Sequence, residues 1–391
     1  MSTLPPLALY VHMPWCVRKC PYCDFNSHRA PNTLPTVDYV DALLADLDHD
    51  VAAGMLRDRE LVSIFMGGGT PSLFSPADIG VLLEGVRGRV RCSNAIEITM
   101  EANPGTIERG AFRDYRAAGV NRVSLGVQSF ADRSLQHLGR IHSSREVFTA
   151  VDELRAAGLD NFNLDLMYAL PQQTLSGAID DLSAAIALQP AHLSHYELTL
   201  EPGTVFHRRP PPQIPGGDEA WDMQEACQAL LAEAGYEQYE ISAYARAERQ
   251  CLHNVNYWRF GDYLGIGAGA HGKLTLAGSI VRTMRQKQPS QYLSAAPADR
   301  VECSPVPVQL LAFEFMLNVL RLRAGFETCQ FENLTGVPAE TIAPQLKEAC
   351  SRGLMQSDSG HWSTTELGRR FLNDLQLLFL PPEPTRSVAS S

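Results

Sequence analysis

Six apolar runs rich in β-branched residues follow one another along the first half of the chain, and most of them end at a glycine or proline. A short run that is hydrophobic on both faces is typical of a strand buried inside a parallel sheet. The runs cover residues 7–14, 61–71, 96–104, 123–129, 162–171 and 193–202. The pattern therefore predicts six parallel strands in the first 205 residues.

Helical periodicity separates these runs. Residues 40–51 and 147–154 carry apolar side chains three and four positions apart, which is the spacing of one helix face. Ser143 and Glu146 form a capping box in front of the second helix. A related tetrapeptide ending in glycine, which suits the end of a helix before a strand, recurs at 116–119, 155–158 and 232–235.

Alternating strands and helices build either a barrel or a doubly wound sheet. Six strand–helix units are too few to close an eightfold barrel. We therefore expect an α/β fold with a partial (β/α)6 TIM-like barrel over residues 1–245. In such a barrel the functional site lies at the carboxyl ends of the strands, and polar residues gather there in this sequence.

The remainder of the chain follows a different pattern. A proline-rich stretch at 209–217 interrupts the alternation and indicates a surface excursion. Residues 246–300 are predicted to connect the barrel to a small helical or winged-helix-like domain at 301–380, where apolar residues recur at helical spacing. The last segment, 381–391, is rich in proline and serine and is expected to be disordered.

Charge and composition narrow the classes of function. The 391 residues contain 33 lysines and arginines against 44 acidic residues, a net charge of −11, and no basic run stands out. Nucleic acid is therefore not an expected partner. Residues 1–6 lack the basic and apolar regions of an export signal, and no apolar run reaches bilayer length without charges. We expect a cytoplasmic protein that is not an integral membrane protein.

Three of the nine cysteines lie within eight residues, directly after the first predicted strand. Cys16, Cys20 and Cys23 have the spacing C-x3-C-x2-C, which suits metal ligation in a reducing compartment better than a disulfide framework. Three thiolates on one loop can hold three corners of a 4Fe-4S cubane and leave the fourth iron open to an exchangeable ligand. Zinc bound by the same cysteines and His28 is the alternative.

Several motifs, in a fixed order, resemble those of the radical S-adenosylmethionine (radical SAM) superfamily. They are the three-cysteine loop, the glycine stretch at 67–71 and the HNxxYW sequence at 253–258. Within the superfamily the chain is similar to the coproporphyrinogen III oxidase-like group, which also contains the heme chaperone HemW branch. The resemblance runs over residues 7–380. It implies a 4Fe-4S cluster on the three cysteines and S-adenosylmethionine as a second cofactor.

The resemblance also implies which residues contact S-adenosylmethionine. A family tyrosine precedes the first cysteine by six residues, and the glycine stretch binds the methionine part through backbone groups, which requires close approach. An arginine binds the cofactor carboxylate and an aspartate the ribose hydroxyls, while a carboxylate and an amide lie near the amino acid and ribose. The matching residues are Tyr10, Gly68, Gly69, Thr70, Glu101, Gln128, Arg140 and Asp165.

Two features favour the chaperone branch over the oxidase. The oxidase has a fourth cysteine two residues after the third, and Phe25 stands at that position here. The oxidase also has a long extension over its site, whereas only nine residues precede Tyr10. Oxidase activity on coproporphyrinogen III is therefore not expected. The alternatives are an oxygen-independent coproporphyrinogen III oxidase or another radical reaction on a tetrapyrrole, and a scaffold with a vestigial barrel, so whether the chain is an enzyme stays open.

The chaperone branch implies heme as cargo and an acceptor protein, which we expect to be respiratory and membrane-associated. His253 of the HNxxYW motif is the candidate heme ligand, with the Cys251 thiolate and His271 as alternatives. Alternatively, His253 is a packed histidine of the core that binds no ligand. Three more histidines flank the last predicted barrel strand, where solvated side chains are expected and contact with substrate is the alternative: His192, His195 and His207.

Overall fold

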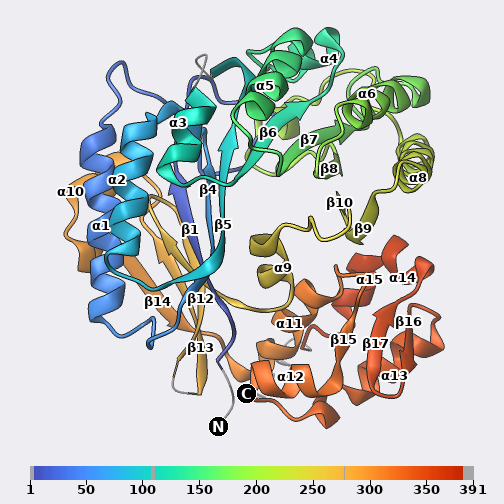
Figure 1. Ribbon diagram of the computed structural model, residues 1–391. Helices are drawn as coiled ribbons and strands as arrows, with labels where there is room; N and C mark the ends of the chain where they lie inside the picture. Colours follow the sequence, from blue (N-terminus) through green and yellow to red (C-terminus); the bar gives the residue numbers. More distant parts are fainter. Residues whose placement is uncertain (1–3, 107–110, 277, 382–391) are drawn as a thin grey trace, which may run out of the picture.

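The computed structural model describes residues 4–106, 111–276 and 278–381. In this part of the chain the principal element is an open sheet of twelve strands (Figure 1). The two edge strands do not pair with each other, so the barrel is partial. From edge to edge the strands are β14 (Val301–Pro305), β13 (Ser279–Arg285), β12 (His271–Leu276), β11 (Asp262–Ile266), β1 (Leu7–Met13), β4 (Leu61–Gly68), β5 (Cys92–Ala102), β6 (Arg122–Gln128), β7 (Phe162–Tyr168), β8 (His192–Glu197), β10 (Ala243–Ala245) and β9 (Glu237–Glu240).

The centre of the sheet is parallel. Strands β1 and β4 to β8 are the six predicted strands, which confirms the predicted partial barrel. One further strand, β11, pairs in parallel with β1. Antiparallel strands extend both sides, β12 to β14 beyond β11 and then β10 and β9 beyond β8. Residues 246–300, expected to form a connection, therefore supply strands β11, β12 and β13 of the sheet.

Helices cover the outer face of the parallel strands (Figure 1). The covering helices are α1 (Thr36–Ala52), α2 (Pro76–Arg87), α3 (Ala111–Ala118), α5 (Ser144–Ala156), α6 (Leu175–Ala187) and α8 (Gly217–Glu233). Shorter helices elsewhere are α4 (Asp132–His137), α7 (Val205–Arg208), α9 (Leu252–Trp258) and α10 (Pro289–Ser294). The predicted capping box opens α5, where the Glu146 carboxylate accepts a hydrogen bond from the backbone N–H of Ser143 at 2.7 Å. Such a cap stabilises a helix by about 1 kcal/mol.

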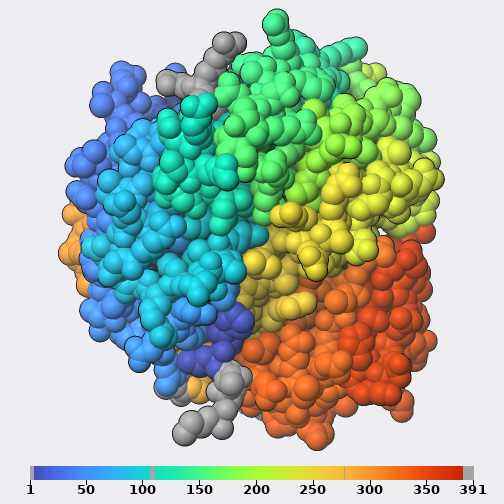
Figure 2. Space-filling view, viewed as in Figure 1, coloured from blue at the N-terminus to red at the C-terminus, as the bar shows by residue number. Residues whose placement is uncertain are grey.

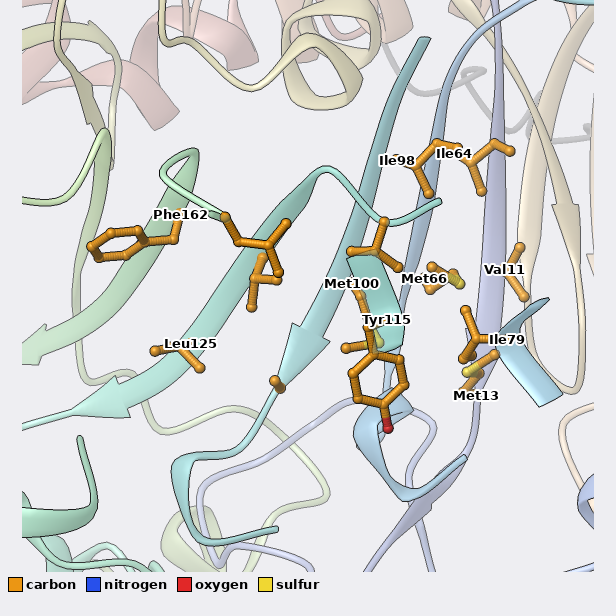
Figure 3. Packing of buried hydrophobic residues seen from close by; sticks show 14 of the residues in the cluster. Val11, Met13, Ile64, Met66, Ile79, Ile98, Met100, Tyr115, Leu125 and Phe162 are labelled. Atoms are coloured by element: carbon orange, nitrogen blue, oxygen red, sulfur yellow. The ribbon is translucent and has the colours of Figure 1, made fainter. Parts of the chain in front are cut away.

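The main core lies between the sheet and these helices (Figure 3). Ile64 of β4, Ile98 and Met100 of β5 and Tyr115 of α3 are each at most 3% exposed. Burying a side chain of this size stabilises a fold by about 1.5–3 kcal/mol. The one polar group among them is satisfied, because the Tyr115 hydroxyl donates to the carbonyl of Phe74 at 2.6 Å. This packing fixes the strands whose carboxyl ends carry the site.

A second, smaller core lies in the C-terminal part. The ring of Phe315 contacts those of Phe260, Phe326 and Phe331, with centroids 5.3–5.4 Å apart. The small domain consists of α11 (Leu311–Val319), α12 (Thr328–Thr335), α13 (Ala343–Ser351), α14 (Glu366–Arg370) and α15 (Leu372–Leu377), with a sheet of β15 (Phe326–Glu327), β17 (His361–Thr364) and β16 (Met355–Asp358). In Figure 2 it abuts the middle of the chain, drawn in yellow. Of the tail predicted to be disordered, residues 382–391 lie outside the described residues.

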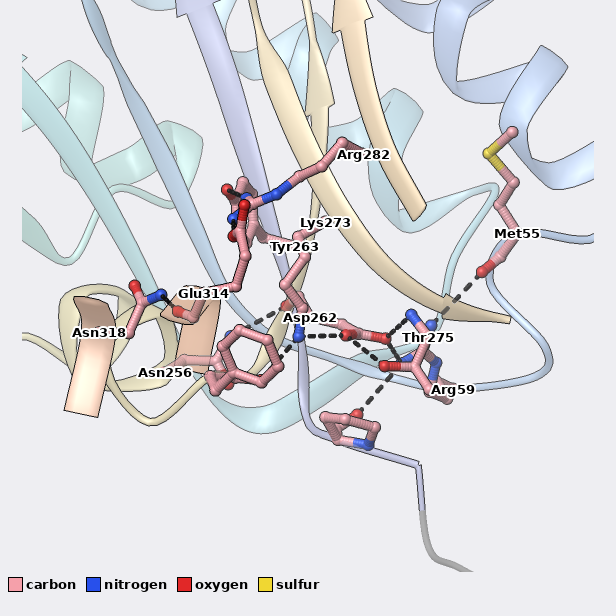
Figure 4. A network of polar contacts seen from close by, with 12 residues as sticks. Met55, Arg59, Asn256, Asp262, Tyr263, Lys273, Thr275, Arg282, Glu314 and Asn318 are labelled. Atoms are coloured by element: carbon pink, nitrogen blue, oxygen red, sulfur yellow. Dashed lines mark hydrogen bonds and ion pairs between the residues drawn. The ribbon is translucent and has the colours of Figure 1, made fainter. Parts of the chain in front are cut away.

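A buried polar network anchors α9 to the sheet (Figure 4). The carboxylate of Asp262, at the start of β11, accepts from Arg59 Nη1 at 2.7 Å and lies 3.1 Å from Lys273 Nζ. Asn256 of α9 donates to the Asp262 carbonyl at 3.0 Å. Removing one partner of a buried ion pair costs about 3–5 kcal/mol, because the other charge is left unpaired. The network therefore fixes α9, the helix that carries His253.

Candidate functional site

A cavity of about 770 Å³ opens at the carboxyl ends of the parallel strands. Its walls come from the loop after β1, from residues along β1 and β4 to β8 and from α9. All the residues that the sequence predicted for the cluster and for S-adenosylmethionine line it, together with the first heme candidate: Tyr10, Cys16, Cys20, Cys23, Gly68, Gly69, Thr70, Glu101, Gln128, Arg140, Asp165 and His253. The fold thus brings together residues that are far apart in the sequence.

The three cysteines lie on one loop that is fixed at its base. Two short strands, β2 (Trp15–Cys16) and β3 (His28–Arg29), pair in parallel where the loop starts and ends. Across the loop, Lys19 Nζ donates to the carbonyls of Phe25 and Ser27 at 3.0 and 3.1 Å. The backbone is therefore held in place, while the three thiols remain only half-buried.

Arg140 links the cysteine loop to β6. Its Nη1 donates to the Cys20 sulfur at 3.6 Å, and its Nη2 donates to the Gly126 carbonyl at 2.6 Å. Its Nε is buried and has no hydrogen-bond partner among the described residues. An unpaired buried donor costs about 1–3 kcal/mol. This N–H is therefore a donor that a bound acceptor, such as a carboxylate, would satisfy.

The donor set fits the predicted cluster. No three His, Cys, Asp or Glu side chains in the described ranges converge closely enough to hold one metal ion. A cubane does not require such convergence, because each thiolate binds a different iron. Burial raises the pKa of the Cys16 and Cys23 thiols, so metal binding has to displace their protons. His28, the fourth ligand of the zinc alternative, does not line this cavity, and its Nε2 lies 3.2 Å from Asn26 Oδ1.

The glycine stretch ends β4 at the cavity wall. The backbone N–H of Gly68 donates to Glu101 Oε2 at 3.1 Å. Those of Gly69 and Thr70 each donate at 2.8 Å to carbonyls of the chain that leaves β1. A Cβ at Gly69 would lie 2.6 Å from these two carbonyl oxygens, so no larger residue fits. Because the three N–H groups are engaged, the carbonyl oxygens are the backbone groups left for a ligand.

Two carboxylates face the cavity from β5 and β7. Burial raises the pKa of Glu101 to about 8, and the neighbouring charge of Asp165 adds to this effect. Burial also raises the pKa of Asp165, although its oxygens accept hydrogen bonds from the Ser124 hydroxyl at 2.9 Å and the Asn163 amide at 2.8 Å. Strongly shifted carboxyl groups in a cavity are typical of a functional site, and this pair favours a ligand with cationic or hydroxyl donors.

Gln128 occupies a strained position at the end of β6. Its φ is +71°, a left-handed conformation that is unusual for any residue other than glycine. The pairing of β6 with β7 shifts register between Gly126 and Gln128, which turns the glutamine toward the cavity. Its Oε1 accepts a hydrogen bond from the Tyr196 hydroxyl at 3.5 Å. Strain of this kind costs about 1–3 kcal/mol and gathers at ligand-binding sites.

Helix α9 brings His253 to the cavity wall. The N–H groups of Leu252 and His253, at the start of the helix, donate to the Glu97 carboxylate, both at 3.1 Å. The Nδ1 of His253 lies 3.1 Å from the Ser63 hydroxyl. Burial, with a smaller contribution from the charge of Arg122, lowers the pKa of His253 to about 3. At pH 7 the ring is therefore a neutral imidazole. Ser63 contacts its Nδ1, and the other nitrogen, Nε2, is left for a ligand.

A chain of buried hydrogen bonds links Asp165 to α9. Asn163 donates to Asp165, and its Oδ1 lies 2.7 Å from Nδ1 of His192. The Nε2 of His192 lies 2.8 Å from the Tyr239 hydroxyl, which accepts from the N–H of Cys251 at 3.4 Å. Burial lowers the pKa of His192 well below its ordinary value. The expectation that this histidine is solvated was wrong, because it is a buried link between two walls of the cavity.

Two family models and several known proteins match this chain. Residues 10–184 match the family model of the Radical SAM superfamily, and residues 308–371 match that of the HemN C-terminal domain. The heme chaperone HemW of Escherichia coli (strain K12) is 50% identical over 384 residues, which cover 97% of this chain and 100% of that protein. The heme chaperone HemW of Haemophilus influenzae is 48% identical, with 98% and 100% covered. The chain belongs to the HemW family.

Membership of the HemW family agrees with the architecture. The solved structure of coproporphyrinogen III oxidase (HemN) from Escherichia coli, described as a radical SAM enzyme, matches with a TM-score of 0.81. The match covers 96% of this chain and 90% of that chain at 23% identity, so it shows the fold alone. No helix in the described part of this HemW-family chain has the length and apolar character needed to cross a bilayer.

Other residues of the HemW-family cavity were missed in the sequence. Arg122 is only 2% exposed, and its Nε lies 3.9 Å from Glu97 Oε2. An arginine at the head of an apolar strand is a usable signal, because a buried charge requires a partner. Of the alternative heme ligands, Cys251 is fully buried outside the cavity lining, and burial raises the pKa of its thiol to about 12. His195 is also buried, contrary to expectation, whereas His207 is exposed as expected.

Proposed function

We propose that this protein is a heme chaperone, which binds heme and transfers it to an acceptor protein. The observation that carries the proposal is the 50% identity with the Escherichia coli heme chaperone HemW over 97% of the chain. The acceptor is proposed to be a respiratory, membrane-associated protein that receives heme on the cytoplasmic side. The absence of a membrane-crossing helix from the described residues is compatible with that location.

The 4Fe-4S cluster is proposed to bind Cys16, Cys20 and Cys23. In support, all three thiols line one cavity on a loop fixed at its base, and Arg140 donates to the Cys20 sulfur. When bound there and reduced, a cluster with an open iron would supply one electron to the sulfonium of S-adenosylmethionine. The chain itself positions the thiolates and limits the access of solvent to them.

S-adenosylmethionine is proposed to occupy the cavity beside the cluster. Glu101 and the carbonyl oxygens of the glycine stretch can accept from its ammonium group, and the unpaired Nε of Arg140 can donate to its carboxylate. Asp165 is held by two donors and can accept from ribose hydroxyls. Tyr10 and the strained Gln128 complete the wall. These groups bind and orient the cofactor, and no proton transfer by them is needed.

His253 is proposed to ligate the heme iron. A ligand has to be neutral, and the low pKa of His253 keeps protons from competing with iron at physiological pH. The contact of Nδ1 with the Ser63 hydroxyl fixes the ring, as the outer partner of a metal-bound histidine does. The hydrogen bonds from the start of α9 to Glu97 fix the backbone that carries it.

Anaerobic reconstitution followed by hemin titration tests the proposal. The wild-type protein is expected to show cluster absorption and, on adding hemin, a shifted Soret band. Hemin-loaded protein should then lose heme to membranes prepared from heme-deficient cells. His253→Ala should weaken hemin binding while the cluster absorption stays unchanged. His207→Ala is the matched control, because that histidine is exposed and lies outside the cavity.

The oxidase alternative predicts a different product. Reduced, reconstituted protein incubated with coproporphyrinogen III and S-adenosylmethionine would then remove two carboxylates from the substrate. The expected result is that the porphyrinogen is unchanged. A protein that binds hemin without cleaving S-adenosylmethionine would be a chaperone with a non-catalytic barrel. A protein that fails to bind hemin at all would refute the proposed function.

A further inference from the structure

A second cavity of about 670 Å³ lies beside the first one. The two cavities share the part of their walls formed by Tyr10, Phe25, Ser27, Gly68, Glu101, His253 and Tyr257. The rest of the second cavity is built by the cysteine loop on one side and by β11, β12 and the chain after β13 on the other. Strands β11 and β12 are among the strands that the sequence did not predict, so this cavity exists because residues 246–300 join the sheet.

Volume argues that heme and the cofactors occupy different cavities. A ligand pocket for one drug-sized molecule measures about 300–1,000 Å³. The first cavity, at about 770 Å³, already has to hold a cluster and S-adenosylmethionine. A tetrapyrrole is another large, flat ligand, so it requires a space of its own. The second cavity has that size and adjoins His253.

The lining of the second cavity has the chemistry of an amphipathic, dianionic ring. Phe25 is 59% exposed, and the rings of Tyr257 and Tyr263 lie 5.1 Å apart. Two ammonium groups, those of Lys19 and Lys287, face the same space in a chain of net charge −11. Asp24 and Glu101 are the acidic residues of the lining. Aromatic faces suit a macrocycle, and the lysines suit its two carboxylates.

The histidines of this cavity differ in what they are free to bind. Both ring nitrogens of His12 have partners, the Tyr10 hydroxyl and the Asn26 carbonyl, and His28 contacts Asn26 Oδ1. The ring of His271, at the start of β12, has no hydrogen-bond partner among the described residues. Its side chain is exposed to the cavity, and its backbone is fixed by pairing with β13.

We propose that the second cavity is the heme site, with His271 as an iron ligand and Lys287 as a contact of one heme carboxylate. The assignment rests on the proposed function and adds to it a place for the cargo. Heme there would touch the wall shared with the first cavity, where His253 lies, without displacing S-adenosylmethionine. Both ring nitrogens of His271 are available to bind iron, and Lys287 likewise makes no ion pair among the described residues.

Two porphyrins separate the roles of these residues. Reconstituted full-length protein is titrated with hemin and with metal-free protoporphyrin IX. His271→Ala should weaken hemin binding about tenfold and shift the Soret band, yet leave protoporphyrin binding unchanged, since only hemin has iron to ligate. Lys287→Glu should weaken both about tenfold, because both carry the carboxylates. His207→Ala and Lys347→Glu are the matched controls, as both residues are exposed and line neither cavity.

The outcomes distinguish this assignment from the proposed function. His271 and Lys287 are exposed, so these variants should fold, and cluster absorption reports that they do. If wild type binds hemin and both variants bind it equally well, the second cavity is not the heme site, although the chaperone proposal stands. Displacement of hemin by S-adenosylmethionine would place heme in the first cavity and also overturn the assignment. If wild type binds no hemin, the proposed function itself fails.

Discussion

Glu101→Gln should change stability and cofactor binding in opposite directions. The pKa of Glu101 rises from 4.5 to about 8 in the folded protein, and each tenfold change in proton affinity corresponds to about 1.36 kcal/mol. Because the folded pKa is raised, its contribution to stability is complete below pH 4.5 and is lost as the pH rises to about 8. The pKa shift alone corresponds to a loss of about 4 kcal/mol in the free energy of unfolding at pH 8. Contact of the carboxylate with cavity water reduces the expected loss to about 2 kcal/mol.

Urea unfolding of the cluster-free protein measures this effect. Between pH 5 and pH 8 the wild type should lose about 2 kcal/mol of unfolding free energy more than Glu101→Gln does. Glu225→Gln, which changes an exposed carboxylate on α8, should follow the wild type. The reconstituted Glu101→Gln protein should nevertheless bind S-adenosylmethionine at least tenfold more weakly, because a neutral amide replaces the acceptor of its ammonium group. Equal pH dependence in wild type and Glu101→Gln would refute the reasoning.

Three further substitutions test other parts of the site. Glu97→Gln should lower the unfolding free energy by about 3 kcal/mol, because it leaves the Arg122 guanidinium buried without its anion; thermal denaturation would contradict this if the midpoint did not move. Gln128→Gly should raise stability by about 1 kcal/mol, since glycine adopts the +71° φ without strain, but should weaken S-adenosylmethionine binding; a loss of stability would show that no strain is present. Cys20→Ala should abolish the 4Fe-4S absorption after reconstitution, whereas Cys303→Ala, at an exposed cysteine outside the cavity, should not; a full cluster signal in Cys20→Ala would contradict the ligand assignment.

The sequence could predict the six central strands because each is a continuous apolar run between turn signals. It could not predict β11, whose five residues include Gly265 within a stretch that resembles a glycine-rich turn. In the sheet that glycine is required, because a Cβ there would lie 2.1 Å from the His271 carbonyl oxygen. The local sequence pattern shows which residues can form a strand. The close approach of a neighbouring strand, which selects glycine here, is a tertiary contact that the pattern does not show.

Site residues that belong to a sequence motif could be predicted. Residues whose role depends on tertiary contacts could not. Gln128 could be found by the family match at the end of a predicted strand, but its left-handed backbone depends on a register shift with β7. His192 looked like a solvated strand-end residue, because nothing in the local sequence shows Asn163 and Tyr239 on its two ring nitrogens. Glu97 likewise gained its role only when the fold placed the start of α9 against it.

The central claim is that one chain holds both a 4Fe-4S cluster on the three cysteines and a heme. The most direct measurement determines iron, acid-labile sulfide and heme in the same anaerobically reconstituted, hemin-loaded sample of wild type and Cys16→Ala. We predict one cluster and one heme for each wild-type chain, and loss of the cluster with retention of heme in Cys16→Ala. A wild-type chain that carries the cluster and no heme, or a Cys16→Ala chain that keeps its cluster, would contradict the account.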